Sequence, residues 1–227
     1  MEHIASNLAA VRARIDAAAR AAGRDPAGVR LVAVSKTFPI EAVREAYAAG
    51  QRDFGENYAQ EWRDKAAALA DLPDLVWHFI GSLQTNKVKI LLGAAPPRAA
   101  WVHTVDREEL ARELSKRAVA RGAVVKVLLE VNVAGEPQKA GCAPEEVPRL
   151  AAAVGALPGL ELRGLMCIPP AEGDPRPHFR ALRTLRDGLG LPDLSMGMTA
   201  DWEAAVEEGA TLVRVGTAIF GARPPRD

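Results

Sequence analysis

The sequence is poor in cysteine and has no excess of charge of either sign. Its two cysteines, Cys142 and Cys167, form no Cys-x-x-Cys pair within the 227 residues. A chain of this length does not depend on disulfides for stability, so we expect a reducing, cytoplasmic location. Lysine plus arginine and aspartate plus glutamate each number 29, which gives a formal net charge of zero. A neutral chain has no overall field that would attract nucleic acid, so we expect no nucleic-acid partner.

Long apolar runs and metal-ligand spacings are also missing. No apolar segment approaches the roughly 20 residues that a membrane span requires. The N-terminal segment carries charges such as Glu2 and Arg12 where a secretory signal would have an apolar core. We therefore expect neither a secretion signal nor a membrane partner. No two histidines are spaced as metal ligands, so no metal site is expected. The histidines are His3, His78, His103 and His178.

What the sequence does contain is a regular alternation of short β-branched runs and helical patterns. The runs lie at 30–35, 52–54, 76–80, 100–105, 123–131, 160–168, 193–196 and 211–215. Helical patterns lie at 40–49, 58–70, 85–92, 107–121, 144–155, 177–189 and 201–208. An additional amphipathic helix is predicted over 2–22, where Ile4, Leu8, Val11 and Ile15 recur at helical spacing.

This alternation predicts the fold class. Strands that alternate with helices form parallel sheets with helical crossovers. Eight such units close into a (β/α)8 barrel, so we predict one α/β TIM-barrel domain over residues 1–227, with an extra N-terminal helix. An open doubly wound sheet is the alternative, but no Gly-x-Gly-x-x-Gly follows the first predicted strand.

Three helix starts carry sequence signals. Asp106 followed by Glu109 resembles a capping box. Pro144 suits a first helical position. Thr199 is predicted to cap the helix that contains Trp202.

Small and hydroxyl-bearing residues follow the last two predicted strands. In (β/α)8 barrels the active mouth is built from the loops after the strands, and phosphate is often held by the loops after strands seven and eight. Ser195 and Thr199 follow the seventh predicted strand, and Gly216 and Thr217 follow the eighth. Glycine lets backbone N–H groups approach phosphate oxygens, and hydroxyls add donors. Taken alone, these residues would be better explained as ordinary turn residues and a helix cap, because glycine and threonine are common in loops.

Lys36 favours the functional interpretation. It follows the apolar run 31–34, which is the first predicted strand. In a closed barrel the first strand adjoins the eighth, so the amine would lie beside the candidate phosphate site. A lysine in apolar surroundings loses its proton more readily and becomes a nucleophile toward carbonyls. Pyridoxal 5'-phosphate (PLP) carries both an aldehyde and a phosphate. The alternative is a solvated lysine at a strand end.

Arg214 lies within the apolar run Leu212-Val213-Arg214-Val215, where a charged group needs a partner. An arginine that faces the pyridine nitrogen is one way in which proteins tune PLP. Because a guanidinium does not readily accept a proton, that nitrogen would stay unprotonated. A structural ion pair with Glu130 or another carboxylate is the competing interpretation.

Several longer motifs occur together in one known family. They are 33–37 (AVSKT), 54–58 (FGENY), 77–87 (WHFIGSLQTNK), 130–132 (EVN), 164–166 (GLM), 194–199 (LSMGMT) and 213–221 (VRVGTAIFG). Through these motifs the sequence resembles the pyridoxal phosphate homeostasis protein family, also called the YggS/PROSC family. The motifs cover most of the chain and follow one another in the family's order.

The resemblance implies a barrel like the N-terminal domain of alanine racemase, with PLP as cofactor. It implies that Lys36 carries PLP as a Schiff base and that Arg214 faces the ring nitrogen. It also implies that Asn57 lies near the cofactor. Around the phosphate the resemblance places Ser195, Thr199, Gly216 and Thr217.

The resemblance further implies a carrier of PLP that keeps vitamin B6 and amino-acid pools in balance, without strong catalysis. PLP-dependent apo-enzymes would be its recipients, and we expect a monomer. A racemase on this fold needs a second base, typically a tyrosine from another domain; only Tyr47 and Tyr58 are present here, and the sequence ends shortly after the eighth predicted strand. A low-activity amino-acid racemase is the alternative, and a phosphosugar enzyme on the same barrel is a third possibility.

The remaining conspicuous residues are predicted to be structural. Without a basic face, the four tryptophans should pack in the core rather than stack on bases. We expect His78 to be a hydrogen-bonded core residue, Glu56 to be a buried ion-pair partner, and Cys167 to be an inert core thiol.

Overall fold

The structure is a computed structural model that describes residues 2–93 and 100–222. Its strands run parallel and form a closed barrel in sequence order, with β8 pairing back to β1. The strands are β1 (Arg30–Val34), β2 (Asp53–Glu56), β3 (Val76–Phe79), β4 (Ala100–Val105), β5 (Val125–Glu130), β6 (Leu160–Met166), β7 (Asp193–Ser195) and β8 (Leu212–Val215). Each strand overlaps one predicted run, so the (β/α)8 barrel is confirmed.

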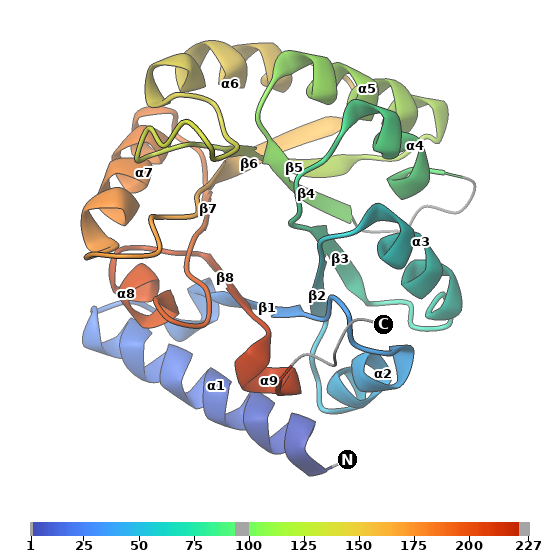
Figure 1. The fold of residues 1–227 in the computed structure, drawn as a ribbon, viewed down its shortest axis with the longest axis vertical. Coiled ribbons are helices and arrows are strands. Elements are labelled where there is room, and N and C mark those ends of the chain that lie inside the picture. Colours follow the sequence, from blue (N-terminus) through green and yellow to red (C-terminus); the bar gives the residue numbers. More distant parts are fainter. Residues whose placement is uncertain (1, 94–99, 223–227) are drawn as a thin grey trace.

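Helices surround the barrel, as Figure 1 shows. The α-helices are α1 (Glu2–Ala21), α2 (Ile40–Ala48), α3 (Ala59–Ala68), α4 (Val88–Leu91), α5 (Glu108–Ala120), α6 (Val147–Gly155), α7 (Arg176–Gly188), α8 (Trp202–Glu207) and α9 (Thr217–Phe220). Short 3₁₀ helices are η1 (Pro26–Gly28), η2 (Thr85–Lys87) and η3 (Pro144–Glu146). The short helix α9 after β8 was not anticipated from the sequence.

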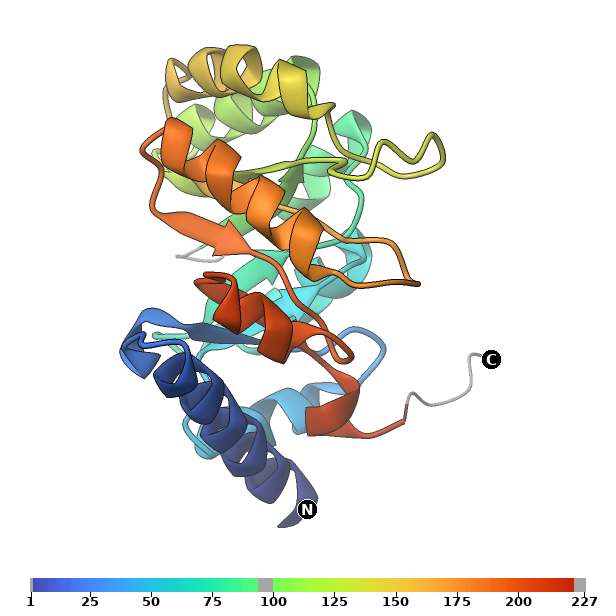
Figure 2. The ribbon, with the colours of Figure 1, turned by 90° about the vertical axis from the view of Figure 1, so that its left-hand side faces the viewer.

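The predicted extra helix at the N-terminus is α1. It lies on the outside of the barrel against α2, α8 and α9. Its buried face is formed by Leu8, Val11 and Ile15, which recur at the helical spacing read from the sequence. In the side view of Figure 2, the loops after β5 and β6 extend on the same side of the barrel as α9. This side is the mouth, where the strands end.

Closure of the barrel brings the first and last strands into register. Arg30 pairs with Leu212 at one end and Ala33 with Val215 at the other. Beyond this pairing, Gly216 approaches β1 so closely that an added Cβ would lie 3.1 Å from the carbonyl oxygen of Val34. Only glycine tolerates so close a backbone approach without displacement. The segments that carry Lys36 and Thr217 therefore lie side by side.

Alternation along the strands separates two environments. On β8, Val213 and Val215 join the apolar core between the sheet and the helices, whereas Leu212 and Arg214 point the other way, into the barrel. The barrel interior includes a small apolar cluster of Trp101, Leu128 and Met166. It also includes several buried polar side chains. These are His78, His103, Glu130, Ser195 and Arg214.

The tryptophans are packing residues, as predicted. Their exposure does not exceed 2% in any case. Trp62 packs against both Trp77 and Phe79, with ring centroids 5.8 and 6.0 Å away. These aromatic contacts join α3 to β3 and so hold the helix that follows β2 against the barrel wall.

Two of the three predicted helix starts are wrong. Helix α5 begins at Glu108 after an extended Arg107, with no side-chain cap. The Asp106 carboxylate instead binds the guanidinium of Arg107 at 2.6 Å, which takes the acceptor away from the helix end. Helix α8 begins after Asp201, whose Oδ1 accepts the Met198 N–H at 2.6 Å, so Thr199 does not cap it. Pro144 occupies the start of η3, as expected.

Candidate functional site

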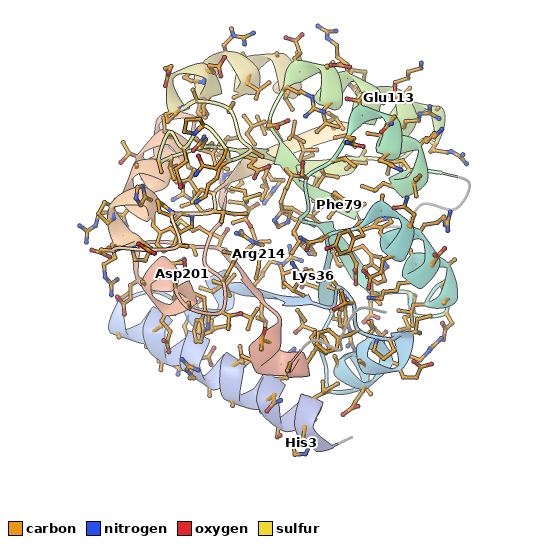
Figure 3. All side chains as sticks on the ribbon, in the orientation of Figure 1. His3, Lys36, Phe79, Glu113, Asp201 and Arg214 are labelled. Carbon is orange, nitrogen blue, oxygen red and sulfur yellow. The ribbon has the colours of Figure 1, made fainter. Side chains whose placement is uncertain are left out.

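A cavity of about 170 Å³ opens at the mouth between β1 and β8. Figure 3 labels Lys36 and Arg214, which lie near the centre of the barrel in that view. The cavity is lined by Val34, Lys36, Phe38, Asn57, Ile80, Ile168, Met198, Thr199, Arg214, Gly216 and Thr217. The structure thus gathers every predicted cofactor residue except Ser195 around one cavity. The hydroxyl of Ser195 is buried behind Arg214, as described below.

The backbone on both sides of Lys36 is held by a buried acid–base cluster. Lys65 of α3 donates to the carbonyl of Ser35 at 2.7 Å and to the carboxylates of Glu56 and Glu61 at 2.8 and 2.7 Å. On the far side of Lys36, the N–H of Thr37 donates to Glu61 Oε1 at 2.6 Å. We call Glu56, Glu61 and Lys65 the lysine clamp, because together they fix the residues before and after Lys36.

Thr37 adopts a conformation that needs such support. Its φ is +68°, in the left-handed region, which a β-branched residue rarely occupies. Such a backbone conformation costs of order 1–3 kcal/mol and persists only where its surroundings impose it. The hydrogen bond from Thr37 to Glu61 supplies part of this constraint. The turn sets the direction in which the chain leaves β1 and passes Lys36 across the cavity.

Glu56 is the buried ion-pair partner that the sequence predicted. Its side chain is fully buried, accepts from the Ser35 hydroxyl at 2.6 Å and pairs with Lys65. Burial raises the pKa of Glu56 to about 7, although Lys65 acts in the opposite direction. The Oε2 atom has no hydrogen-bond partner among the described residues. Burial and the pairing with Lys65 therefore act in opposite directions on the ionisation of Glu56.

Asn57 brings an amide to the same cavity. Its Oδ1 is buried and has no hydrogen-bond partner within the described chain. Its backbone is locked by Gly81, where an added Cβ would lie 2.2 Å from the Asn57 carbonyl oxygen. A buried acceptor without a partner is costly. The position of Asn57 on the cavity wall suits an acceptor that a bound ligand would satisfy.

The opposite wall carries glycine and hydroxyl groups. Gly216 and Thr217 stand at the start of α9, and Thr199 faces the cavity from the loop after β7. The first N–H groups of a helix have no acceptor within it. One side of the cavity is therefore lined by residues that can offer backbone N–H groups and two threonine hydroxyls to an anion such as phosphate.

Arg214 closes the floor of the cavity. Its guanidinium donates to Ser195 Oγ at 2.5 Å and to the carbonyl of Cys167 at 3.0 Å. Among the described residues neither Glu130 nor any other carboxylate forms an ion pair with it, so the competing interpretation from the sequence is wrong. Burial, followed by the charge of Asp106, raises the pKa of Glu130 to about 7. Arg214 is therefore a buried cation with neutral partners, and this leaves it able to face a ligand.

Several residues of this site carry no signal in the sequence. Glu61 and Lys65 are spaced i,i+4 on α3 and look like an exposed helix pair. Only the packing of α3 against β2 buries Lys65, leaving 5% of its side chain exposed. His103 lies within the apolar strand β4, where nothing in the sequence distinguishes it from a core histidine.

Two other predicted features agree with the structure. His78 is fully buried and hydrogen-bonded, and Cys167 is buried with its pKa raised by desolvation to about 12, as for an inert thiol. Over residues 2–93 and 100–222, no three His, Cys, Asp or Glu side chains gather in a way that could hold a metal ion. In the same part of the chain, no helix has the length and apolar character required to cross a membrane.

Comparison with known proteins places this geometry in a family. A family model described as alanine racemase, N-terminal domain, matches residues 6–224. A relative from Pseudomonas aeruginosa named pyridoxal phosphate homeostasis protein is 55% identical, over 98% of this chain and 97% of its own length. The Escherichia coli protein of the same name is 44% identical, over 98% of both chains.

The chain belongs to the pyridoxal phosphate homeostasis protein family. A solved structure in this group is PipY of Synechococcus elongatus with PLP bound, which is 39% identical with a TM-score of 0.82 over 96% of this chain and 100% of PipY. Alanine racemase of Clostridium difficile shares the fold, with a TM-score of 0.71 and 13% identity over 100% of this chain and 58% of the racemase. The expected likeness to alanine racemase is therefore confirmed at the level of the fold.

Proposed function

We propose that this protein binds PLP in the cavity at the barrel mouth and carries it as a Schiff base on Lys36. The observation that carries the proposal is the gathering of Lys36, Arg214 and the Gly216–Thr217 backbone around a single cavity. PLP supplies an aldehyde and an electron-accepting ring. Lys36 is a primary amine and can condense with an aldehyde with loss of water.

The other lining residues fit the remaining groups of PLP. Thr199, Gly216 and Thr217 would hold the phosphate through hydroxyls and backbone N–H groups. Arg214 would face the ring nitrogen and donate to it. Asn57, whose buried Oδ1 has no partner among the described residues, would bind a polar substituent of the ring. Ser195 does not line the cavity, so the structure offers no contact that would support its predicted place at the phosphate.

The site supports carriage of PLP better than strong catalysis. A racemase needs a second base opposite the lysine. Tyr47 donates to Asp74 on the outside of the barrel, and Tyr58 is 42% exposed; neither lines the cavity. We propose that the protein holds PLP for intracellular vitamin B6 and amino-acid homeostasis and passes it to PLP-dependent apo-enzymes. We further propose a single cytoplasmic domain that acts as a monomer.

Reduction and peptide mapping test the linkage. The protein is loaded with PLP, treated with borohydride, digested and analysed by mass spectrometry. The modified peptide should contain Lys36. The Lys36→Ala protein should lose both this adduct and the visible absorbance of the Schiff base. Lys87→Ala is the matched control, since Lys87 is the last residue of η2 and does not line the cavity. An adduct on another lysine in the Lys36→Ala protein would refute the assignment.

A racemase assay tests the second candidate, which the alanine racemase fold favours. The PLP-loaded chain is incubated with L-alanine and with L-serine, and formation of the D-enantiomers is followed. We expect at most slow turnover. Turnover on the order of tens per second that is lost in Lys36→Ala would make the protein a racemase.

A further inference from the structure

A continuous chain of hydrogen bonds crosses the barrel interior behind Arg214. Arg214 donates to Ser195 Oγ at 2.5 Å, and Ser195 Oγ lies 2.9 Å from His103 Nδ1. His103 Nε2 lies 2.9 Å from His78 Nδ1, and His78 Nε2 lies 2.8 Å from Asp53 Oδ1. The chain therefore runs from the cavity floor to the opposite end of the barrel and connects β8, β7, β4, β3 and β2.

Every link in this chain has only one consistent direction. At one end, Asp53 also accepts from Arg30 at 2.7 Å, so the carboxylate accepts and His78 Nε2 donates to it. A neutral His78 must then accept at Nδ1, and His103 Nε2 must donate. His103 Nδ1 in turn accepts the Ser195 hydroxyl proton. At the other end a guanidinium can only donate, so Ser195 Oγ accepts from Arg214.

Burial supports neutral imidazoles in the middle of the chain. His78 and His103 are fully buried. Desolvation lowers the pKa of His78, although Asp53 opposes it. Desolvation, followed by the electrostatic influence of the adjoining His78 ring and of the Arg214 guanidinium, lowers the pKa of His103 well below its ordinary value. The ring of His78 also stacks on Trp101, with centroids 5.5 Å apart, which fixes its plane.

We propose that Ser195, His103 and His78 are positioning residues that hold the Arg214 guanidinium toward the cofactor cavity through a one-way chain of donors ending at Asp53. Two of the guanidinium N–H groups are used, by Ser195 and by the Cys167 carbonyl, so the plane of the group is set from two directions. The fixed plane of the guanidinium then sets the direction of its remaining N–H groups. Because the chain ends on a carboxylate, each donor is polarised in the same direction.

The effect on the cofactor follows from this geometry and rests on the proposed function. Arg214 with fixed N–H groups would present a donor, and no acceptor, to a ring nitrogen. Loss of an internal link would let the guanidinium rotate or pair elsewhere, for example with the nearby charge of Glu130. The sequence assigned Ser195 to the phosphate, whereas its contacts place it in this chain.

The first experiment needs no cofactor. Nitrogen-15 NMR of histidine-labelled protein distinguishes protonated from unprotonated ring nitrogens, with the exposed His3 as an internal reference. Both His78 and His103 should show a protonated Nε2 and an unprotonated Nδ1. A protonated Nδ1 on either ring would reverse the chain and overturn the proposal, whether or not the protein binds PLP.

The second experiment compares two identical substitutions. Ser195→Ala removes the link between Arg214 and His103. Ser115→Ala removes another buried hydroxyl, which donates to the Pro158 carbonyl at 2.7 Å away from the site. Only Ser195→Ala should change the His103 nitrogen-15 signals, shift the visible absorbance of bound PLP, and raise its apparent Kd by roughly tenfold, as for one lost hydrogen bond.

The outcomes separate the two proposals. Unchanged His103 signals and an unchanged PLP spectrum in Ser195→Ala would refute the positioning role while leaving PLP binding intact. Failure of the parent protein to bind PLP would refute the proposed function, but the nitrogen-15 measurement on cofactor-free protein would still test the chain. Equal effects of Ser115→Ala and Ser195→Ala on PLP binding would indicate general destabilisation and would also refute the role.

Discussion

The lysine clamp gives a prediction that can be worked through from the structure. Lys65→Met keeps the unbranched apolar part of the side chain but removes the ammonium group and its three hydrogen bonds to Ser35, Glu56 and Glu61. Glu56 would then remain fully buried with only the Ser35 hydroxyl as a partner. The charged form of this carboxyl would then have no cation beside it to stabilise it.

The expected loss of folding stability in Lys65→Met is large near and above neutral pH. Removing one partner of a buried ion pair typically costs about 3–5 kcal/mol. In a chain of this size each kcal/mol lowers Tm by roughly 2–4 °C, so Tm should fall by about 6–20 °C. This is a substantial part of the roughly 5–15 kcal/mol that separates folded from unfolded states.

The pH dependence distinguishes this cause from simple loss of packing. In the parent protein the folded pKa of Glu56 is raised to about 7, above the ordinary value of 4.5. A raised carboxyl pKa means that the stability contributed by this group falls as pH rises from 4.5 to about 7 and is constant beyond. Without Lys65 the folded pKa rises further. The free energy of unfolding of Lys65→Met should therefore keep falling above pH 7, by about 1.4 kcal/mol per pH unit.

Thermal and urea unfolding from pH 6 to pH 9 measure this difference. The control is the double variant Lys65→Met with Glu56→Gln, in which position 56 has no carboxyl to ionise, so the added pH dependence should disappear. Equal destabilisation of Lys65→Met at pH 6 and pH 9 would show that Glu56 is not the source. Because Lys65 also holds the Ser35 carbonyl beside Lys36, the single variant should form its PLP linkage more slowly.

Three further outcomes are expected. Gly81→Ala should lower the urea midpoint of unfolding strongly, since its Cβ would lie 2.2 Å from the Asn57 carbonyl oxygen. Gly155 has open space around it, so Gly155→Ala should leave the midpoint unchanged, and equal midpoints for the two variants would contradict the packing argument. Thr217→Val should weaken PLP binding by roughly tenfold in an equilibrium titration. The control is Thr184→Val, which removes a hydroxyl that donates within α7 and should not change the affinity; equal affinities of the two variants would show that Thr217 does not hold the phosphate. Both cysteines are buried with pKa values raised to about 12 by desolvation, so neither should react with a thiol reagent at pH 8 until denaturant is added; fast reaction in the folded protein would contradict that burial.

Local patterns were sufficient to predict most of the secondary structure and several of the residues that line the cavity. Strands of apolar, β-branched residues and helices of amphipathic spacing follow from neighbours in the sequence. The position of Lys36 after the first strand and of Gly216 after the last was enough to place them together, because a closed barrel makes those strands adjacent. The helix starts at 106–109 and at 199 were wrong because Arg107 binds the Asp106 carboxylate, and because α8 begins only after Asp201, whose carboxylate accepts the Met198 N–H.

Ser195 and Lys65 mark the limit of this reasoning. A serine at the end of a strand and a lysine four residues after a glutamate have ordinary roles in a linear sequence. In the folded barrel each side chain binds a residue that is distant in the sequence. Ser195 bonds to His103 across 92 residues, and Lys65 bonds to Ser35 across 30. Direction of side chains at the barrel mouth depends on strand register, which no local pattern records.

The sequence alone predicts the order and kind of the elements, because these depend on periodicity. It also predicts which end of the barrel holds the candidate site and that Lys36 lies there, because parallel strands all end on one side of the barrel. The buried cluster behind Lys36 and the donor chain behind Arg214 arise only when eight strands enclose a common interior. Charges and imidazoles there are removed from water, and each must satisfy the others.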